Sequence, residues 1–197
     1  GVAVGWSTMI LPHSLKDIID NTIRAIKGEK LKPMVPHYDK YDVTIKPLEE
    51  NKWEISGKVR IDNTSTMTIT EIPPGMDVDN FRKKLIEMED SEQIEEFTEH
   101  STDNICIEIR MKRGALKDWD ENRALDFLKL RQKVTQRIVV VGWGGKTIQT
   151  YNDPRDLISD FVQFRLNVYE DRYKLLLEKT SDELLYWKLL ELLFKNG

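Results

Sequence analysis

The sequence predicts an α+β protein, in which an antiparallel-sheet domain with flanking helices is followed by a long helix that begins a coiled-coil arm. Short runs between residues 41 and 111 alternate apolar and polar residues, as strands with one wet face do. Helix-start signals stand before, between and after these runs, at Ser14, Asp77 and Asp153. Residues 155–194 contain neither Pro nor Gly, which favours one long helical segment.

The composition sets the size and the redox setting of the protein. Its 197 residues are 40% hydrophobic and 32% charged, which suits one or two small domains with real cores. The net charge of −4 identifies no partner, because charge acts locally. Cys106 is the only cysteine, so a disulfide within the chain is impossible and a cysteine-based zinc site is not expected. We expect a reducing, cytoplasmic location.

No feature of the sequence predicts a membrane partner. No apolar run approaches the roughly 20 residues that cross a bilayer. The opening stretch has neither the basic n-region nor the cleavage site of a signal peptide. The first residue is Gly rather than Met, so we expect a piece of a longer chain.

The first helix is predicted directly after the opening stretch. Ser14 and Asp17 form a capping box, with Ser14 as the N-cap. The apolar positions that follow lie mostly on one helical face, and Gly28 ends the helix.

Three alternating runs then predict an antiparallel meander with one wet face. The first holds Tyr41 and Ile45, the second extends from Trp53 to Ile61, and the third begins at Met67. Turn-like residues 49–51 and 62–65 separate them, and the Pro-Pro-Gly at 73–75 ends the sheet.

The middle of the chain mixes helices and strands. We expect a helix at 77–89, a strand at 105–111, a helix at 120–131, and strands at 137–141 and 146–151 joined by a turn at 142–145. Residues 87–99 include seven acidic and no basic side chains, and we interpret them as a solvated face or loop that does not touch a polyanion.

The last helix begins at Asp153 and Pro154, as N-cap and first helical residue. Apolar residues then follow at the 4-3-4 spacing of a coiled-coil seam: Leu157, Phe161, Phe164 and Val168. A helix over 154–179 is about 40 Å long at roughly 1.5 Å per residue, so it should project as an arm. Residues 180–182 are expected to break it and cap a second helix.

Several chemistries are excluded by the residues present. The opening glycines lack the Lys of a phosphate-binding Walker loop. The three histidines have no metal-binding spacing, so no metal site is expected, and Asp77 with Asp79 is interpreted as helix-capping acid rather than a magnesium site. No nucleophile with a paired base is visible, and Cys106 most simply packs on a strand.

Basic residues gather between 110 and 146, with ten Lys or Arg against four Asp or Glu. They suit either an ordinary solvated surface or a stripe that contacts phosphates and makes binding salt-dependent. The candidate stripe consists of Lys112, Arg113, Lys117, Arg123, Lys129, Arg131, Lys133 and Arg137.

The opening GVAVGWSTMILPHSL resembles the segment that follows the cleavage domain in the DNA-cleaving subunit of type II topoisomerases, the gyrase A-like family. Further family elements follow in the same order: ITEIP at 69–73, TDNI at 102–105, KTIQTYN at 146–152 and FVQFRLNVY at 161–169. AVG and PHSL look bacterial while GWST looks eukaryotic. This mixture is most similar to the medium subunit of T-even phage topoisomerases.

The resemblance implies a fold and a division of labour. Residues 1–28 would join the cleavage domain to the rest, 29–152 would form the tower domain, and 153–197 would form the root of the coiled-coil arm. The nucleophilic tyrosine of the family lies in an Arg-Tyr-Thr motif, which this sequence lacks, so no catalytic residue is expected here. No cofactor is expected in this segment, because Mg²⁺ and ATP are used by other parts of the enzyme.

The resemblance also implies partners and contacts. The partners would be double-stranded DNA, a second copy joined through the arm and other regions, and the ATPase subunit, in the host cytoplasm or nucleoid if the source is a phage. Val2 stands where the family has an intercalating Ile, although a core-strand role stays open for it. The expected DNA contacts are Val2, Ala3, Ser7, Thr8, His13, Lys16, Lys129 and Arg131.

The expected function is to bind and bend the gate-segment duplex of an ATP-dependent type II topoisomerase for double-strand passage. An isolated segment of this kind should be inactive. A non-enzymatic architectural DNA-binding protein is the alternative, since its charge and wedge chemistry would look the same. A small-molecule enzyme is a weaker rival, because it would need a pocket with converging polar groups.

Overall fold

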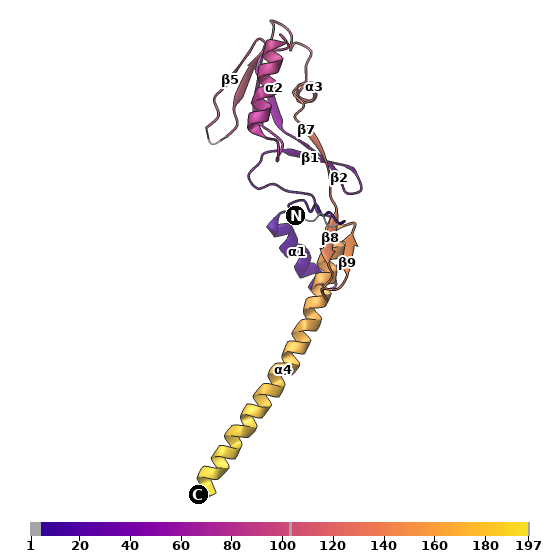
Figure 1. The fold of residues 1–197 in the computed structure, drawn as a ribbon, viewed down its shortest axis with the longest axis vertical. Helices are drawn as coiled ribbons and strands as arrows, with labels where there is room; N and C mark the ends of the chain where they lie inside the picture. The colour runs from indigo at the N-terminus through magenta and orange to yellow at the C-terminus, as the bar shows by residue number, and fades with distance from the viewer. Residues whose placement is uncertain (1–4, 103, 197) are drawn as a thin grey trace.

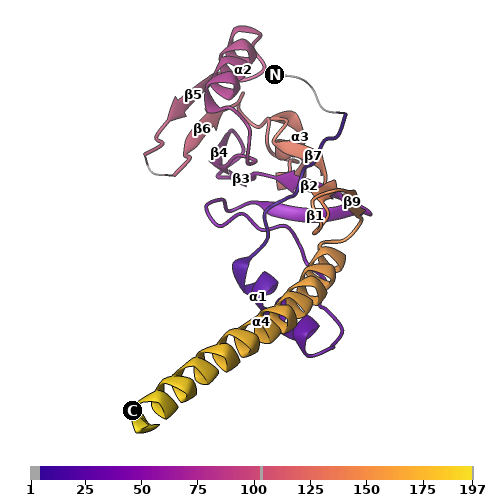
Figure 2. The same cartoon turned by 60° about the horizontal axis from the view of Figure 1, so that its bottom comes forward.

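The computed structural model describes residues 5–102 and 104–196, and it has the elongated outline of a sheet domain carried on a rod (Figures 1 and 2). The rod is a single helix, and the C-terminal end of the chain lies at its far tip (Figure 1). The helices of the described chain are α1 (Leu15–Ile26), α2 (Val78–Asp90), α3 (Glu121–Phe127) and α4 (Pro154–Asn196).

Every strand pair in the described chain is antiparallel, which confirms the predicted α+β class. The strands are β1 (Thr44–Glu49), β2 (Lys52–Ser56), β3 (Lys58–Ile61), β4 (Thr66–Glu71), β5 (Glu96–Glu99), β6 (Ile107–Arg110), β7 (Arg131–Thr135), β8 (Ile138–Val141) and β9 (Ile148–Tyr151). They form a three-stranded sheet β1-β2-β7, a four-stranded sheet β3-β4-β6-β5 and a hairpin β8-β9.

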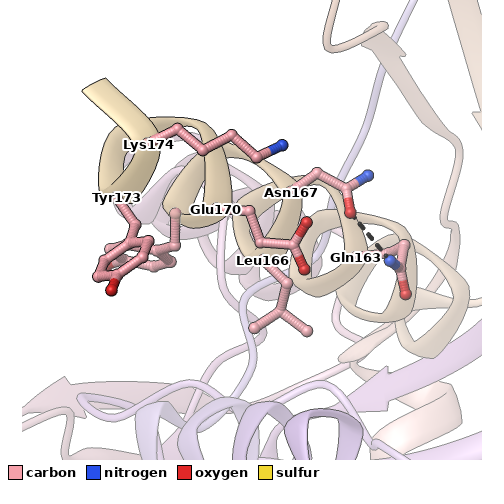
Figure 3. Close-up of a pocket in the computed structure, with 7 residues that line it drawn as sticks. Gln163, Leu166, Asn167, Glu170, Tyr173 and Lys174 are labelled. Atoms are coloured by element: carbon pink, nitrogen blue, oxygen red, sulfur yellow. Dashed lines mark hydrogen bonds between the residues drawn. The ribbon is translucent and has the colours of Figure 1, made fainter. Parts of the chain in front are cut away.

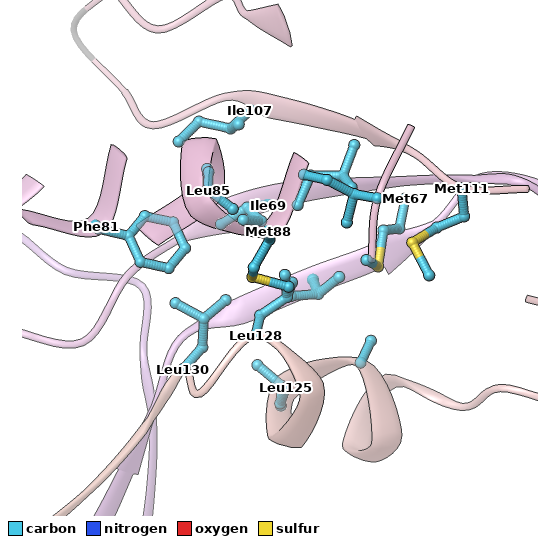
Figure 4. Packing of buried hydrophobic residues seen from close by; sticks show 14 of the residues in the cluster. Met67, Ile69, Phe81, Leu85, Met88, Ile107, Met111, Leu125, Leu128 and Leu130 are labelled. Carbon is cyan, nitrogen blue, oxygen red and sulfur yellow. The ribbon is translucent and has the colours of Figure 1, made fainter. Parts of the chain in front are cut away.

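The hydrophobic core lies on one face of the four-stranded sheet, where α2 and α3 both contribute buried residues (Figure 4). Met67 faces Ile109 across β4 and β6, and Ile69 faces Ile107, and all four side chains are at most 1% exposed. Burying a side chain of this size stabilises the fold by about 1.5–3 kcal/mol. This core therefore anchors the sheet domain at the end of the molecule opposite the tip of α4 (Figure 1).

The predicted single meander is wrong, because the run from Trp53 to Ile61 is divided between two sheets at Gly57. The Gly57 N–H donates to the carbonyl of Leu130 at 3.0 Å instead of continuing one ladder. A Cβ at Gly57 would lie 2.2 Å from the carbonyl oxygen of Glu71. Only a glycine allows the chain to pass this point, so alternation alone could not reveal the break.

Two strands fall where the sequence predicted none. The helix expected at 120–131 ends at Phe127, because Lys129 adopts φ +55° and the Leu130 N–H returns to the Leu125 carbonyl at 2.9 Å. The chain then enters β7.

The other unpredicted strand is β5, which forms within the acidic run at 87–99 and pairs with β6. Its charges have partners, since Glu99 accepts two hydrogen bonds from Arg82 at 2.7 and 2.8 Å, and Glu96 pairs with Arg110. The run is therefore in part a neutralised sheet edge rather than a solvated loop.

Helix α1 forms as predicted and is followed by Gly28 at φ +71°, but its buried side is polar. The Asn21 side chain is 2% exposed, and its amide both donates to the Lys32 carbonyl at 3.2 Å and accepts from the Lys32 N–H at 2.7 Å. The helix isoleucines at 18, 19, 23 and 26 are 38–56% exposed. Ser14 is the N-cap, although its side chain makes no capping hydrogen bond.

The root of α4 is packed against the β8-β9 hairpin and α1 (Figures 1 and 2). The predicted turn at 142–145 joins the two strands, and its Trp143 lies 5.3 Å, centroid to centroid, from both Phe161 and Phe164. Two residues of the proposed coiled-coil seam thus contact the hairpin of their own chain.

The break predicted at 180–182 is wrong, because α4 continues without interruption to Asn196. The Ser181 hydroxyl donates to the Leu177 carbonyl four residues earlier, at 2.8 Å. This bond satisfies the side chain inside the helix, so the serine does not act as a cap.

Candidate nucleic-acid interface

The segment that follows the opening glycines is fixed to the connection between β7 and β8. Met9 and Arg137 form an antiparallel bridge, in which the Met9 N–H donates to the Arg137 carbonyl at 2.8 Å and the Arg137 N–H donates to the Met9 carbonyl at 2.9 Å. Val2 and Ala3, the predicted wedge and its neighbour, lie outside the described residues.

Thr8 strengthens this attachment. Its hydroxyl donates to the Arg137 carbonyl at 3.1 Å and accepts from the Val139 N–H at 3.3 Å. Both interactions are internal to the protein, so Thr8 serves here to hold the segment rather than to offer its proton to a phosphate.

Ser7 lies beside a cation. The Arg137 guanidinium donates from Nη1 to the Ser7 hydroxyl oxygen at 3.1 Å, and both residues are exposed. Because the Ser7 oxygen accepts this bond, its own proton stays available to a further acceptor.

His13 is enclosed between the opening segment and the chain near Pro36, with which it forms an isolated antiparallel bridge. Its Nε2 is buried and has no hydrogen-bond partner within the described chain. Desolvation lowers the pKa of His13 below its usual value of 6.5, against smaller opposing effects of a backbone hydrogen bond at Leu11 and of the charges of Asp153 and Asp17. The ring is therefore neutral at pH 7 and is a poor cation for a phosphate.

Lys16 lies in the first turn of α1 and is exposed, free to reach an anion near the start of that helix. The helix start itself carries a partial positive charge that favours anions.

Lys129 and Arg131 follow α3 at the other end of β7, and they differ in their surroundings. Lys129 is exposed and borders a hollow that it shares with Lys84, whose ammonium donates to the Leu128 carbonyl. Burial, and to a smaller degree the charge of Lys129, lowers the pKa of Lys84.

Arg131 is engaged by neighbouring side chains. Its Nη1 donates to Glu54 Oε1 at 2.9 Å and its Nη2 to Asn122 Oδ1 at 2.7 Å. Its Nε lies 2.8 Å from Asp126 Oδ1, at ion-pair distance but outside hydrogen-bond alignment. Only 20% of the side chain is exposed, so the structure gives Arg131 a role in joining β7 to α3 and β2.

The described site residues do not gather in one place, since His13 and Lys16 lie at the start of α1 and the others lie near the two ends of β7. Ser7 and Thr8 lie at the Arg137 end of β7, and Lys129 lies at the other end. Six residues of extended chain separate Arg131 from Arg137, which is about 20 Å at 3.3 Å per residue. Other members of the stripe also have partners, such as Lys112 with Glu92 and Arg123 over the Trp119 ring.

Arg137 is not among the DNA contacts predicted from the sequence, although the structure places it beside Ser7. It was one of eight cations in the candidate stripe, with nothing to distinguish it. Its contact with Ser7 joins residues 130 positions apart, and no local pattern in the sequence marks such a contact.

The described chain contains no group of three or more metal-ligating side chains, and Asp77 accepts from the Asn80 N–H at 2.9 Å as a helix cap, as predicted. A hollow of about 530 Å³ lies along α4, and its lining residues all come from that one helix (Figure 3). Within the described part of the chain, no helix has the length and apolar character of a membrane span.

Known proteins resemble the chain over almost its whole length. It is 27% identical to DNA topoisomerase 2 of Candida albicans over 94% of this chain, and 29% identical to DNA topoisomerase 2 of Plasmodium falciparum over 93%. A solved structure, the Plasmodium falciparum topoisomerase II DNA-binding, cleavage and re-ligation domain, superimposes with a TM-score of 0.81 and 28% identity.

These similarities cover only part of the relatives. The chain spans 13% of each of the two curated relatives, and the superposition covers 91% of this chain but 25% of the solved one. The family of DNA gyrase and topoisomerase IV A-type subunits matches residues 1–196. Because this match includes nearly every residue, the chain belongs to the DNA gyrase/topoisomerase IV A-subunit family.

Proposed function

We propose that this chain is the part of an ATP-dependent type II DNA topoisomerase that binds and bends the gate-segment duplex. The observation that carries the proposal is the family match over residues 1–196, together with the attachment of residues 7–9 to Arg137. That attachment holds residues 7–9, which follow Val2 by five to seven positions, against the connection between β7 and β8.

Bending would follow from a wedge and flanking phosphate contacts. Val2, with Ala3 beside it, would insert at a base step, where an apolar wedge costs a few kcal/mol of unstacking and lets the bent duplex cover more protein. Ser7, Lys16 and Lys129 are the other predicted contacts whose polar groups are exposed. Ser7 lies beside Arg137, Lys16 lies on α1, and Lys129 lies before the start of β7, an arrangement that suits a duplex contacting the protein at more than one point.

The chemistry of strand passage would be supplied elsewhere in the complete enzyme. The cleavage domain would supply the nucleophilic tyrosine. An acidic cluster elsewhere in the enzyme would bind Mg²⁺, and the ATPase region or subunit would hydrolyse ATP. The exposed apolar side chains of distal α4, such as Leu184, Trp187 and Phe194, suit an arm that pairs with other helices of a dimer.

The attribution to a T-even phage medium subunit rests on the mixture of AVG, PHSL and GWST in the opening stretch. The relatives named above are eukaryotic. A phage-type enzyme carries its ATPase on a separate polypeptide. The attribution is therefore tested by purifying the full-length protein and asking whether a separate ATPase polypeptide co-purifies with it. A fused ATPase would contradict it.

The architectural alternative is separated from a topoisomerase by covalent chemistry. The full-length protein, with its ATPase, Mg²⁺ and supercoiled plasmid, should yield linear DNA attached to protein when the reaction is stopped with detergent. An architectural protein would bind and bend the same plasmid without covalent attachment. Absence of attached DNA under conditions of tight binding would overturn the enzymatic proposal.

A further inference from the structure

The Arg137 guanidinium has a neutral hydrogen-bond partner rather than a carboxylate. Most arginines of the described chain pair with a carboxylate or lie over an aromatic ring: Arg24, Arg60, Arg82, Arg110, Arg123, Arg131, Arg155 and Arg165. Arg137 instead donates to the Ser7 hydroxyl and forms no ion pair within the described ranges. Its charge is exposed and not compensated by a neighbouring carboxylate.

The position of this charge is fixed by the backbone. Two hydrogen bonds between Arg137 and Met9, and two more through the Thr8 hydroxyl, hold the connection between β7 and β8 against residues 8 and 9. None of these bonds uses the guanidinium. The side chain can therefore bind a ligand without weakening the attachment.

The donor set of the pair matches a phosphate. A guanidinium has five N–H donors, and the bond to Ser7 engages one of them. The Ser7 proton adds another donor beside it. A phosphodiester offers only acceptors and one negative charge, and charge-assisted bonds from Arg to phosphate are among the stronger hydrogen bonds in proteins.

The pair also lies close to the predicted wedge along the chain. Ser7 follows Val2 by five positions, and a fully extended chain of that length spans at most about 17 Å. With one phosphate per roughly 3.4 Å along each DNA strand, this reach corresponds to about five base pairs.

We propose that Arg137 and Ser7 together bind one backbone phosphate of the duplex, within about five base pairs of the step that Val2 enters. This contact would set the register of the wedge on the DNA. The inference rests on the proposed function, because it needs a duplex at the opening segment. It assigns the anchoring role to Arg137 rather than to Arg131, whose guanidinium is already engaged by Glu54 and Asn122.

The first test measures DNA binding by the full-length enzyme as a function of KCl concentration, using a fluorescent duplex with one strong cleavage site. Arg137→Gln should weaken binding roughly tenfold and reduce the salt slope by about 1. Ser7→Ala should weaken binding less and leave the slope unchanged, since it removes no charge. Arg137→Lys should keep the slope while losing part of the affinity.

The matched control is Arg113→Gln, which removes another exposed arginine, in the turn after β6. It should change binding little. If Arg113→Gln weakens binding as much as Arg137→Gln, or if Arg137→Gln binds as wild type does, the proposal is overturned. If the wild-type enzyme shows no salt-dependent binding at all, the proposed function fails instead.

The second test locates the phosphate. A single neutral methylphosphonate replaces each phosphate of the bound duplex in turn, on both strands. At one position, the substitution should weaken DNA binding by the wild type. The same substitution should not affect binding by Arg137→Gln, which has no charge to lose a partner, and should have a smaller effect on Arg137→Lys, which keeps the charge. The Lys variant keeps the test informative should the Gln variant fold poorly. If the methylphosphonate at each position changes DNA binding by the same factor in the wild type and in both variants, Arg137 contacts no phosphate.

Discussion

The indole ring of Trp143 lies stacked on the phenyl ring of Phe164, with centroids 5.3 Å apart and ring planes 15° apart. Trp143 is at the tip of the β8-β9 hairpin and Phe164 is in the third turn of α4. The same indole lies 5.3 Å from Phe161, at 51°. The Trp143 side chain thus packs the turn of the hairpin against the helix.

Replacing this residue should loosen the root of the arm. Trp143→Ala removes both aromatic contacts, and we expect a loss of about 2 kcal/mol in the free energy of unfolding. Amide hydrogen exchange in the hairpin and in the first turns of α4 should become faster. Trp143→Phe, which keeps an aromatic ring, is the control. If the Ala variant and the wild type exchange at equal rates, Trp143 does not hold the hairpin against α4.

Gly57 should tolerate no side chain. Gly57→Ala places a Cβ 2.2 Å from the Glu71 carbonyl oxygen, so the backbone must move, and we expect a destabilisation of about 2 kcal/mol. Gly144→Ala is the matched control, since a Cβ there meets no atom within 4 Å. Urea denaturation measures both. Equal midpoints for the two variants would show that the crossing between the sheets relaxes easily.

Stability should depend on pH through His13. Desolvation lowers the folded-state pKa of His13 below 6.5, so the unfolded chain binds the proton first as pH falls. The stability contributed by the neutral ring is therefore complete above about pH 6.5 and declines as pH falls from there toward the folded-state pKa. Chemical denaturation at pH 7.5, 6.5 and 5.5 should show this decline in the wild type.

The matching variant isolates that contribution. His13→Gln cannot titrate, so its stability should change less than that of the wild type between pH 7.5 and 5.5. A decline of the same size in both proteins would assign the effect to other groups.

Arg131 should contribute to the stability of the fold, whereas Lys129 should contribute to DNA binding and not to stability. Arg131→Gln leaves Glu54 without its charged partner, and we expect a loss of about 2 kcal/mol in the free energy of unfolding. Lys129→Gln should leave the thermal midpoint unchanged, since its side chain is exposed. Lys129→Glu alone is then the variant that reports DNA contact, with weaker binding to all duplex sequences. A large fall in the midpoint of Lys129→Gln would reverse this assignment.

The wedge is tested by bending. In the full-length enzyme, Val2→Ala should reduce DNA bending and cleavage, and Val2→Ile should strengthen them, because the larger side chain fills more of an opened base step. Fluorescence transfer between labelled duplex ends measures the bend. If Val2 instead belongs to a core strand, Val2→Ala will lower the thermal midpoint while the bend stays unchanged.

Local signals in the sequence predicted the helix starts well. Asp77 and Asp153 both accept a backbone N–H at the start of the helix that they precede, at 2.9 and 2.8 Å. Such caps involve neighbouring residues only, so their chemistry is visible in a few letters.

Features that depend on distant contacts were missed. The change of sheet at Gly57 depends on Glu71 and Leu130. The strand β7 is preceded by Lys129 at φ +55°, a conformation in which Gly would be usual. In the candidate site, Ser7 and Lys16 are exposed and stay predicted contacts, while the enclosure of His13 and the ion pairs of Arg131 arise from partners that no spacing rule relates to them.

The uninterrupted course of α4 through residues 180–182 has a mechanical consequence. A helix of 43 residues is about 65 Å long at 1.5 Å per residue. Because it is held at its root by Trp143 and α1, it acts as a lever with its pivot at the hairpin. A tilt of about 5° at that pivot carries the tip through about 6 Å, which is simple geometry for a rod of this length. Small movements of the opening segment against the β7-β8 connection that tilt α4 would thus produce large displacements at the C-terminal end of α4.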